Sequence, residues 1–597
     1  MKKINYWLFI ILVAIFSSCR EDQPDPDPII EQFPAENDRE FDNGSGIDLI
    51  ELNERLTEDL ALLGRIWGGL KYHHPEVGKG NYNWDYELFR ILPTYVQVKS
   101  TEERDRIISG WINKYGEIRA CTTCRETPNN ALIKPDLLWA ENSNMNNALK
   151  AKIREIYQNR NQGEHFYIRI DETVGHPEFL HEYPYSNKIF PDAGFRLLAL
   201  YRYWNMIHYF FPYKYLTDKN WDDILTEYVP MLIAAENRLE YELAITQIIA
   251  ETNDTHATFI NGRSRLEELK GNKYPPFQVR FIEGKLVVTL YYKPELKETS
   301  GLEIGDVITH INGETVESIV ANLKKYYPAS NEVSSLLYMS SDLLRSDQNT
   351  ITVHYNSMGK SGQKEIQLYD RFILNIPSVT DSWVTVDKNK AYFRILDENI
   401  GYVTLASIRN EDVATIKESF KNTKGIIVDI RNYPSSIEAS RSLGSYFVRT
   451  YQAFAYHFGG KSDNPGEFSY LWRPYISYDG SKYFEGKLIV LINEITLSNA
   501  EYAAMCFRSG LNTYIIGSTT AGSVGRNPTI VLPGGITTTM TGLGTRCTDG
   551  TETQRVGIIP DIWVEPTIEG IREGRDELLE MAINLINEDS FIPNPLP

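Results

Sequence analysis

Residues 485–507, EGKLIVLINEITLSNAEYAAMCF, have the pattern of a buried strand, a tight turn and a helix. Residues 488–492 form a continuous apolar run of strand length, and the alanines from Ala500 onward fit a helix that begins just after Ser498. A hydroxyl at such a junction lies beside the free N–H groups of the first helical turn, which suits a nucleophile. The alternative is that Ser498 is an N-cap, with Glu501 completing a capping box.

Four apolar strand candidates alternate with helical patterns between residues 385 and 597. They are IGYVTL, GIIVDIR, KLIVLIN and TYIIGS, with helices expected after the second and third, and the chain ends in an amphipathic pattern at residues 571–588. Strands that alternate with helices predict an α/β domain with a parallel sheet. At 597 residues the chain has room for several domains.

An internal repeat occupies the first half of the chain. LLGRIWGGLKYHHPEVGKGNYNWDYELFRILP at residues 62–93 returns as ALYRYWNMIHYFFPYKYLTDKNWDDILTEYVP at residues 199–230, at a constant offset of 137. Apolar spacing in both copies is helical, and each Trp-Asp pair opens a helix. We therefore predict a helical domain at residues 47–185 and a second helical segment at residues 186–270. The same offset sets Arg119 against His256, so only the second copy carries this histidine.

Residues 272–372 change to short alternating runs around GLEIGDVITHINGETV, residues 301–316. The spacing of glycines and apolar residues in this motif resembles a PDZ domain, and its glycines allow tight turns. The resemblance implies a β-rich domain that adds a peptide as an extra strand and holds its C-terminal carboxylate. A PDZ-like fold that serves only for packing is the alternative.

Residues 1–19, MKKINYWLFIILVAIFSSC, contain two lysines, an apolar run and small residues before Cys19. This resembles a bacterial lipoprotein signal peptide, and the resemblance implies cleavage before Cys19 and lipidation of that residue. An ordinary secretory signal is the alternative, and both place the protein outside the cytoplasm. Residues 20–46 are rich in proline and acidic residues, which predicts a disordered tether.

The cysteines fit that compartment. Cys121 and Cys124 are close together in RACTTCRE, and an oxidising environment favours a local disulfide over a zinc site, because no second pair of ligands follows. Cys506 and Cys547 are expected to be separate thiols. The net charge of −19 argues against binding to nucleic acid.

Five motifs occur in a recognisable order: His256 ahead of the PDZ-like region, then VDIRNYPSS, TLSNAEY, GSTTAGSVG and VGIIPDI. Together they resemble the tail-specific (C-terminal processing) serine protease family, over roughly residues 199–588. The resemblance implies a crotonase-like (ClpP-like) α/β catalytic domain at residues 385–597, with Ser498 as the nucleophile. The whole chain is then a multidomain protein with an α/β catalytic domain, a PDZ-like domain and an N-terminal helical repeat region.

The family uses one of two general bases. One branch uses a lysine downstream of the serine, but no lysine follows Lys487. The other branch, resembling tricorn protease, uses a histidine from an upstream segment, preceded by a hydroxyl residue that relays to an acid. His256 with Thr255 matches this arrangement, and a neutral imidazole titrating near ~6.5 serves as a base at neutral pH.

Two positions depart from the family pattern. The relay acid is replaced by Gln554, with Glu552 two positions earlier, so the sequence leaves open which of them completes the relay. The glycine pair of the oxyanion motif is replaced by two serines, of which Ser435 would supply one N–H and Asn499 the other.

The sequence therefore predicts a serine endopeptidase that acts on envelope or extracellular polypeptides and is held to the membrane by a lipid. It predicts no metal and no organic cofactor, and it leaves the oligomeric state open. The alternatives are a peptide-binding lipoprotein whose turnover has been lost through the changes at Gln554 and Ser435, and an esterase that uses the same hydroxyl.

Overall fold

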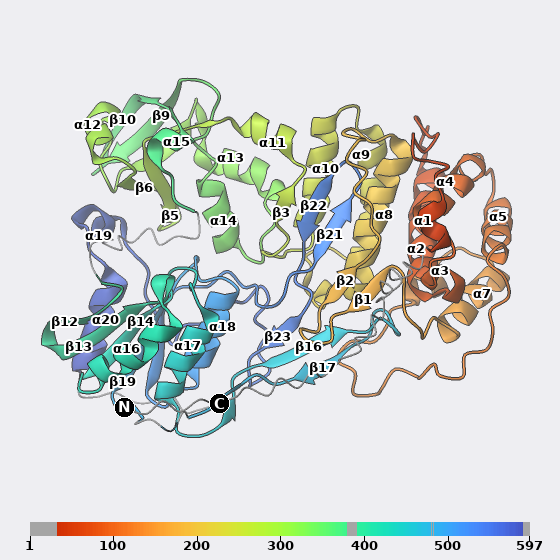
Figure 1. The fold of residues 1–597 in the computed structure, drawn as a ribbon. Coiled ribbons are helices and arrows are strands. Elements are labelled where there is room, and N and C mark those ends of the chain that lie inside the picture. The colour runs from red at the N-terminus through yellow and green to blue at the C-terminus, as the bar shows by residue number, and fades with distance from the viewer. Residues whose placement is uncertain (1–32, 379–390, 479, 481–482, 589–597) are drawn as a thin grey trace, which may run out of the picture.

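The computed structural model describes residues 33–378, 391–478, 480 and 483–588. The predicted signal peptide, Cys19 and the first part of the tether lie outside these residues. Within the described ranges no helix is long and apolar enough to cross a membrane. The chain forms a helical region, a β-rich region and an α/β region, which Figure 1 shows in red to yellow, in green, and in teal to blue.

A six-stranded sheet forms the centre of the α/β region. Five neighbouring strands run parallel and the edge strand β12 is antiparallel, in the order β12-β13-β14-β19-β20-β24. All four predicted strands are present and adjacent. The strands are β12 (Phe393–Leu396), β13 (Ile400–Thr404), β14 (Gly425–Asp429), β19 (Lys487–Ile492), β20 (Thr513–Gly517) and β24 (Ile562–Trp563).

Both faces of this sheet are covered, which explains the continuous apolar runs. One face packs against α16 (Val413–Phe420), α17 (Ile437–Gly444) and α18 (Asn499–Arg508). The other face packs against α20 (Glu577–Asn587). The final amphipathic pattern is not one helix, because α19 (Ile568–Glu573) ends at Gly574, which adopts a left-handed conformation with φ 70°.

The helical region repeats its elements at the offset seen in the sequence. The first copy contains α2 (Glu54–His73), α4 (Trp84–Tyr95) and α5 (Thr101–Asn113). The second contains α8 (Ala193–Phe210), α9 (Trp221–Ala234) and α10 (Arg238–Ala250). The first residues of α4 and α9, and both ends of α5 and α10, are equivalent positions.

The β-rich region, which we call the insert domain, contains a six-stranded antiparallel sheet. Its order is β10-β9-β7-β6-β5, with β8 paired to β7, so β5 is an edge strand. Helix α14 (Glu332–Ser340) packs beside β5. The strands are β5 (Phe277–Ile282), β6 (Lys285–Tyr291), β7 (Val307–Ile311), β8 (Glu314–Thr315), β9 (Thr350–Ser357) and β10 (Lys360–Gln367).

The α/β region reaches back onto the helical region. Strand β3 (Phe259–Asn261), which follows the His256 loop, pairs with β22 (Ile536–Thr539), and β22 pairs with β21 (Thr529–Leu532). Figure 1 shows β21 and β22 beside α8 and α10. These pairings anchor the end of the second copy to the α/β region.

Residues 33–46 belong to the tether that the sequence predicts, but they pack onto the helical region: Phe33 and Phe41 contact its core, and the Ser45 N–H donates a hydrogen bond to Asp192. The structure joins Cys121 to Cys124 by a disulfide. Cys506 and Cys547 are free thiols.

Candidate active site

Ser498 occupies the bend between β19 and α18. Its φ of 57° and ψ of −110° lie outside the regions that a residue with a β-carbon normally adopts. Strain of this kind is characteristic of functional sites. Ser498 is the N-cap residue of α18, and Glu501 accepts its N–H at 3.0 Å, as the capping-box alternative predicts. The strained bend also leaves a half-buried hydroxyl at the carboxyl ends of the parallel strands.

Glu501 holds this bend in place from inside the protein. Its buried carboxylate accepts the N–H groups of Ser498 (3.0 Å), Gly522 (2.8 Å) and Ser523 (3.1 Å), and the hydroxyl of Thr520 (2.6 Å). Burial raises the pKa of Glu501 to about 7, although the four donors favour the ionised form. Glu501 therefore joins the turn after β19 to the loop after β20.

His256 lies in the loop after α10 with its ring buried. Its Nδ1 is 2.8 Å from Thr541 Oγ1 and 2.9 Å from Ser523 Oγ. Both hydroxyls also lie beside Asp254 Oδ1, at 2.8 and 2.9 Å. An ionised carboxylate only accepts hydrogen bonds, so each hydroxyl donates to Asp254 and presents a lone pair to the imidazole. This assigns the proton to Nδ1 and leaves Nε2 unprotonated, with no hydrogen bond to any residue the structure describes.

Asp254 is the acid that the sequence reasoning missed. It is fully buried, and it also accepts the N–H groups of Thr541 (2.6 Å) and His256 (3.1 Å). Burial lowers the pKa of His256, and the charge of Asp254 opposes that shift. The available signal was an acidic residue two positions before the histidine, but in a loop that pattern is equally typical of a turn.

The structure separates the two candidates for the relay position. The Gln554 amide donates to Asp254 Oδ1 (3.1 Å) and to Ser330 Oγ (3.3 Å), so it lies directly behind the acid. Glu552 instead pairs with Arg546 and accepts the Tyr215 hydroxyl. A neutral side chain at position 554 is compatible with the buried carboxylate of Asp254, whereas a second carboxylate there would repel it.

The Thr255 hydroxyl has no hydrogen bond to the His256 ring within the described structure, whereas the sequence predicts that it orients this ring. Its hydroxyl donates to Ala521 O (3.1 Å) and accepts the Ser330 N–H (2.8 Å), while its own N–H donates to Ser330 Oγ (2.9 Å). Successive side chains in this turn point in different directions, so Thr255 fixes the loop while hydroxyls from distant segments reach the ring.

Of the two backbone N–H groups predicted to bind the oxyanion, that of Ser435 is already hydrogen-bonded and that of Asn499 is not, within the part of the chain that the structure describes. The Ser435 N–H donates to Leu405 O (3.0 Å), and its hydroxyl donates to Ile408 O (2.6 Å), so in this conformation Ser435 is not a free donor. Asn499 is the first residue of α18, and its backbone N–H has no acceptor among the described residues. Its side chain donates to Tyr433 Oη (2.8 Å).

Ser498 and His256 are linked through two side chains and not by a direct hydrogen bond in the described structure. Glu501 accepts the N–H groups of both Ser498 and Ser523, and the Ser523 hydroxyl reaches the His256 ring. Catalytic hydrogen bonds are often long before substrate binds. Among the described residues no group of three or more His, Cys, Asp or Glu side chains is arranged to hold a metal ion.

Comparison with known proteins places this site in context. Residues 399–564 match peptidase family S41, and no curated protein matches the chain. Mature CPAF is similar in structure, with a TM-score of 0.53, 15% identity, and coverage of 67% of this chain and 99% of CPAF. CPAF complexed with lactacystin gives a TM-score of 0.51 and 14% identity over 66% of this chain and 98% of that chain. The photosystem II D1 C-terminal processing protease gives a TM-score of 0.36 and 18% identity, with coverage of 66% of this chain and 98% of that protease.

The likeness to CPAF shows the fold, and the family match covers the strands and loops that carry Ser498, Glu501 and Ser523. With the strained serine at the start of α18, the match of residues 399–564 to peptidase family S41 supports a serine peptidase.

Proposed function

We propose that the protein is an envelope-anchored serine endopeptidase in which Ser498 is the nucleophile and His256 the general base. The observation that carries this proposal is the chain of contacts from Asp254 through two hydroxyls to His256 Nδ1. It leaves Nε2 as the basic nitrogen, which is the form that a serine nucleophile requires.

In this mechanism Ser498 Oγ attacks the peptide carbonyl carbon while His256 Nε2 takes the hydroxyl proton. The imidazolium that forms is stabilised by Asp254 through Ser523 and Thr541. His256 then gives the proton to the leaving amine. A water molecule, deprotonated by His256, hydrolyses the acyl-enzyme and restores Ser498.

The oxyanion would bind at the N-terminus of α18. The Asn499 N–H has no acceptor there in the described ranges, and the helix end favours negative charge. We assign Ser435 no oxyanion role in this conformation, because its N–H is bonded to Leu405.

The substrates would be proteins or peptides of the cell envelope or beyond. We propose that the insert domain is PDZ-like and that Cys19 carries the lipid that holds the protein to the membrane. The supporting features are the edge position of β5, which suits strand addition, and the signal sequence ending at Cys19.

Incubation of the purified protein with a mixed peptide library, read by mass spectrometry, tests the proposed activity. We expect cleavage by the wild type and none by Ser498→Ala. Ser509→Ala, the same substitution at the other end of α18, should leave cleavage unchanged. Labelling by a fluorophosphonate without peptide cleavage would favour an esterase, and peptide binding without turnover would favour a binding protein.

A further inference from the structure

A cavity near the catalytic loop lies between the helical region and the insert domain. Its volume is about 490 Å³, which is within the range of ligand sites. Ala257, Thr258 and Phe259, the residues directly after His256, line one side. Another side is formed by β5 and by the end of α14. Anything bound here therefore contacts the segment that carries the catalytic histidine.

The charge of this cavity is opposite to that of the whole protein. Five basic side chains and two acidic ones line it, which gives a formal charge of +3 in a chain of net charge −19. Glu494, whose charge also acts on Arg280, lowers the local excess but does not reverse it. The lining charged residues are Arg263, Glu267, Lys270, Arg280, Asp342, Arg345 and Arg371.

The two carboxylates are already shared among three cations. Asp342 pairs with Lys270 and Arg345, both at 2.8 Å. Glu267 pairs with Arg345 (3.0 Å), Lys270 (3.2 Å) and Arg263 (3.3 Å). This network holds the basic groups in fixed positions, so their positive field is preorganised before a ligand arrives.

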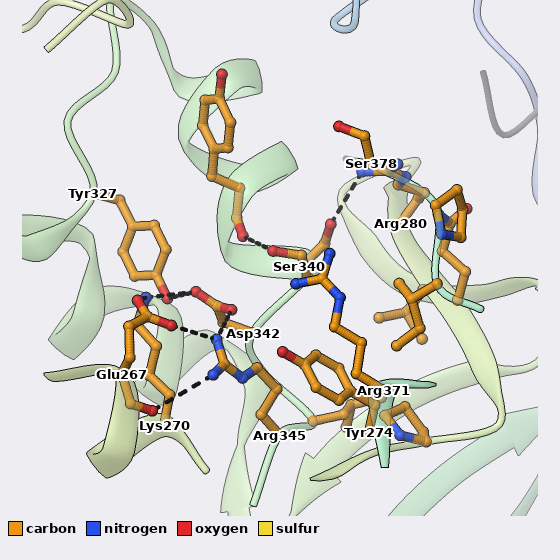
Figure 2. Close-up of a pocket in the computed structure, with 18 of the residues that line it drawn as sticks. Glu267, Lys270, Tyr274, Arg280, Tyr327, Ser340, Asp342, Arg345, Arg371 and Ser378 are labelled. Carbon is orange, nitrogen blue, oxygen red and sulfur yellow. Dashed lines mark hydrogen bonds and ion pairs between the residues drawn. The ribbon is translucent and has the colours of Figure 1, made fainter. Parts of the chain in front are cut away.

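Arg280 and Arg371 lie across the cavity from that network, as Figure 2 shows. Arg280 is buried on β5, and burial lowers its pKa. Arg371 begins the short helix α15 (Arg371–Leu374), is exposed, and forms no ion pair with any residue in the described ranges. A negative group that enters between the two sides would meet cations on both.

The remaining walls suit an extended polypeptide. Five tyrosines line the cavity, and β5 is an edge strand of its sheet, a position suited to strand addition. Main-chain bonds to β5 would orient the polypeptide, and the basic groups would select its side chains. The tyrosines are Tyr274, Tyr292, Tyr326, Tyr327 and Tyr338.

We propose that this cavity binds the acidic side chains of substrate polypeptides, so that the enzyme selects substrates that carry an acidic segment. The inference rests on the proposed peptidase function and specifies its substrate class. The acidic surface of the protein repels such segments in general, and the cavity supplies the local reversal of sign that admits them.

The test is binding of labelled peptides to the full-length Ser498→Ala protein, measured by fluorescence anisotropy. One peptide ends in a glutamate-rich segment and its partner carries glutamine at the same positions. A third has the glutamates and an amidated C-terminus. We expect the glutamate peptide to bind about tenfold more tightly than the glutamine peptide at about 50 mM salt, with the preference shrinking at about 300 mM. Amidation of the C-terminus should leave most of the preference for the glutamate peptide.

A pair of charge-matched variants locates the effect. Arg371→Gln should reduce the glutamate preference roughly three- to tenfold. Lys360→Gln removes the same charge from β10, at the opposite edge of the same sheet, and should leave the preference intact.

Equal binding of the glutamate and glutamine peptides would overturn the proposal, as would equal losses in the two variants. A preference abolished by amidation would also overturn it, because the cavity would then read the terminal carboxylate. If the binding preference holds but the wild type cleaves no peptide, the peptidase assignment fails while the ligand class stands.

Discussion

In both copies of the helical repeat, two tryptophans exchange hydrogen bonds with each other's main chain. Trp67 Nε1 donates to Trp84 O and Trp84 Nε1 donates to Trp67 O, at 2.9 and 2.8 Å. Trp204 and Trp221 make the same exchange at 2.7 and 3.0 Å. The repeated residues of the sequence are therefore those that lock one helix to the next.

The copies also face each other through equivalent positions. Gly64 lies against its equivalent, Tyr201, and Gly68 lies against Asn205; a β-carbon at either glycine would overlap the opposing side chain. A small residue in one copy thus accommodates a large one in the other.

The copies differ in the loop that follows the third helix. Gly116 and its equivalent Asn253 both adopt positive φ, so the chain turns in the same way. Glu117 is then equivalent to Asp254, but it is exposed, whereas Asp254 is fully buried beside His256. The turn alone does not make a site; the hydroxyls of Ser523 and Thr541, which the α/β region brings to His256, do.

The largest difference between the two copies is expected from substitution of Asp254, the acid behind His256. Asp254→Asn replaces an acceptor with an amide that can donate, so the assigned Nδ1–H tautomer of His256 is lost, and peptide hydrolysis should fall about 1,000- to 10,000-fold. Glu117→Gln, the same change in the first copy, should have no effect. Steady-state kinetics of both variants measure this, and activity of Asp254→Asn within tenfold of wild type would contradict it.

A smaller effect concerns Glu501, which joins the serine turn to the loop that meets the second copy. Its folded-state pKa is raised to about 7, so the stability it contributes is fully present below its unfolded pKa of about 4.5 and is lost as pH rises through about 7. Between about pH 4.5 and pH 7 the wild-type free energy of unfolding should fall by up to about 3 kcal/mol because of Glu501, and Glu501→Gln should abolish this fall.

Urea unfolding at a series of pH values measures this difference. Glu565→Gln, at an exposed position, is the matched control and should keep the wild-type slope. Identical slopes for wild type and Glu501→Gln would show that the Glu501 carboxyl group does not titrate in this window.

Because both copies contain the same pair of hydrogen-bonded tryptophans, equivalent substitutions should destabilise the protein equally. Trp67→Phe and Trp204→Phe each remove one indole donor and the hydrogen bond it makes to a buried helix-start carbonyl, so each should lower the free energy of unfolding by about 1–2 kcal/mol. Thermal or urea denaturation gives the values. A loss of stability for only one of the two variants would show that the tryptophan pairs are not equivalent in the two copies.

The smallest expected effect is at Thr255. Its substitution by valine removes the bonds to Ala521 and Ser330 but none of the contacts to the His256 ring. Peptide hydrolysis should fall by less than about tenfold, with the main loss in stability. A loss as large as that of Asp254→Asn would restore the orienting role that the sequence suggested for Thr255.

The sequence predicts those parts of the fold and the site that depend on neighbouring residues along the chain. Continuous apolar runs identified the parallel strands, and the strand-turn-helix pattern identified Ser498. Asp254 was missed because the residues that give it a role are distant along the chain: Thr541 is 287 residues away and Gln554 is 300. Ser435 was assigned a free N–H because nothing in its motif shows that Leu405 O lies beside it.

The central claim is that His256 removes the proton from Ser498, and kcat/KM for peptide hydrolysis across pH 5 to 9 tests it most directly. Because burial lowers the pKa of His256, the wild-type rate should rise with pH through a value below ~6.5. Ser498→Ala and His256→Ala should each lose about 10,000-fold or more, and the double variant no more than either. Arg119→Ala, the first-copy equivalent, should match wild type. Hydrolysis by His256→Ala at near wild-type rates, with Ser498→Ala inactive, would contradict the account.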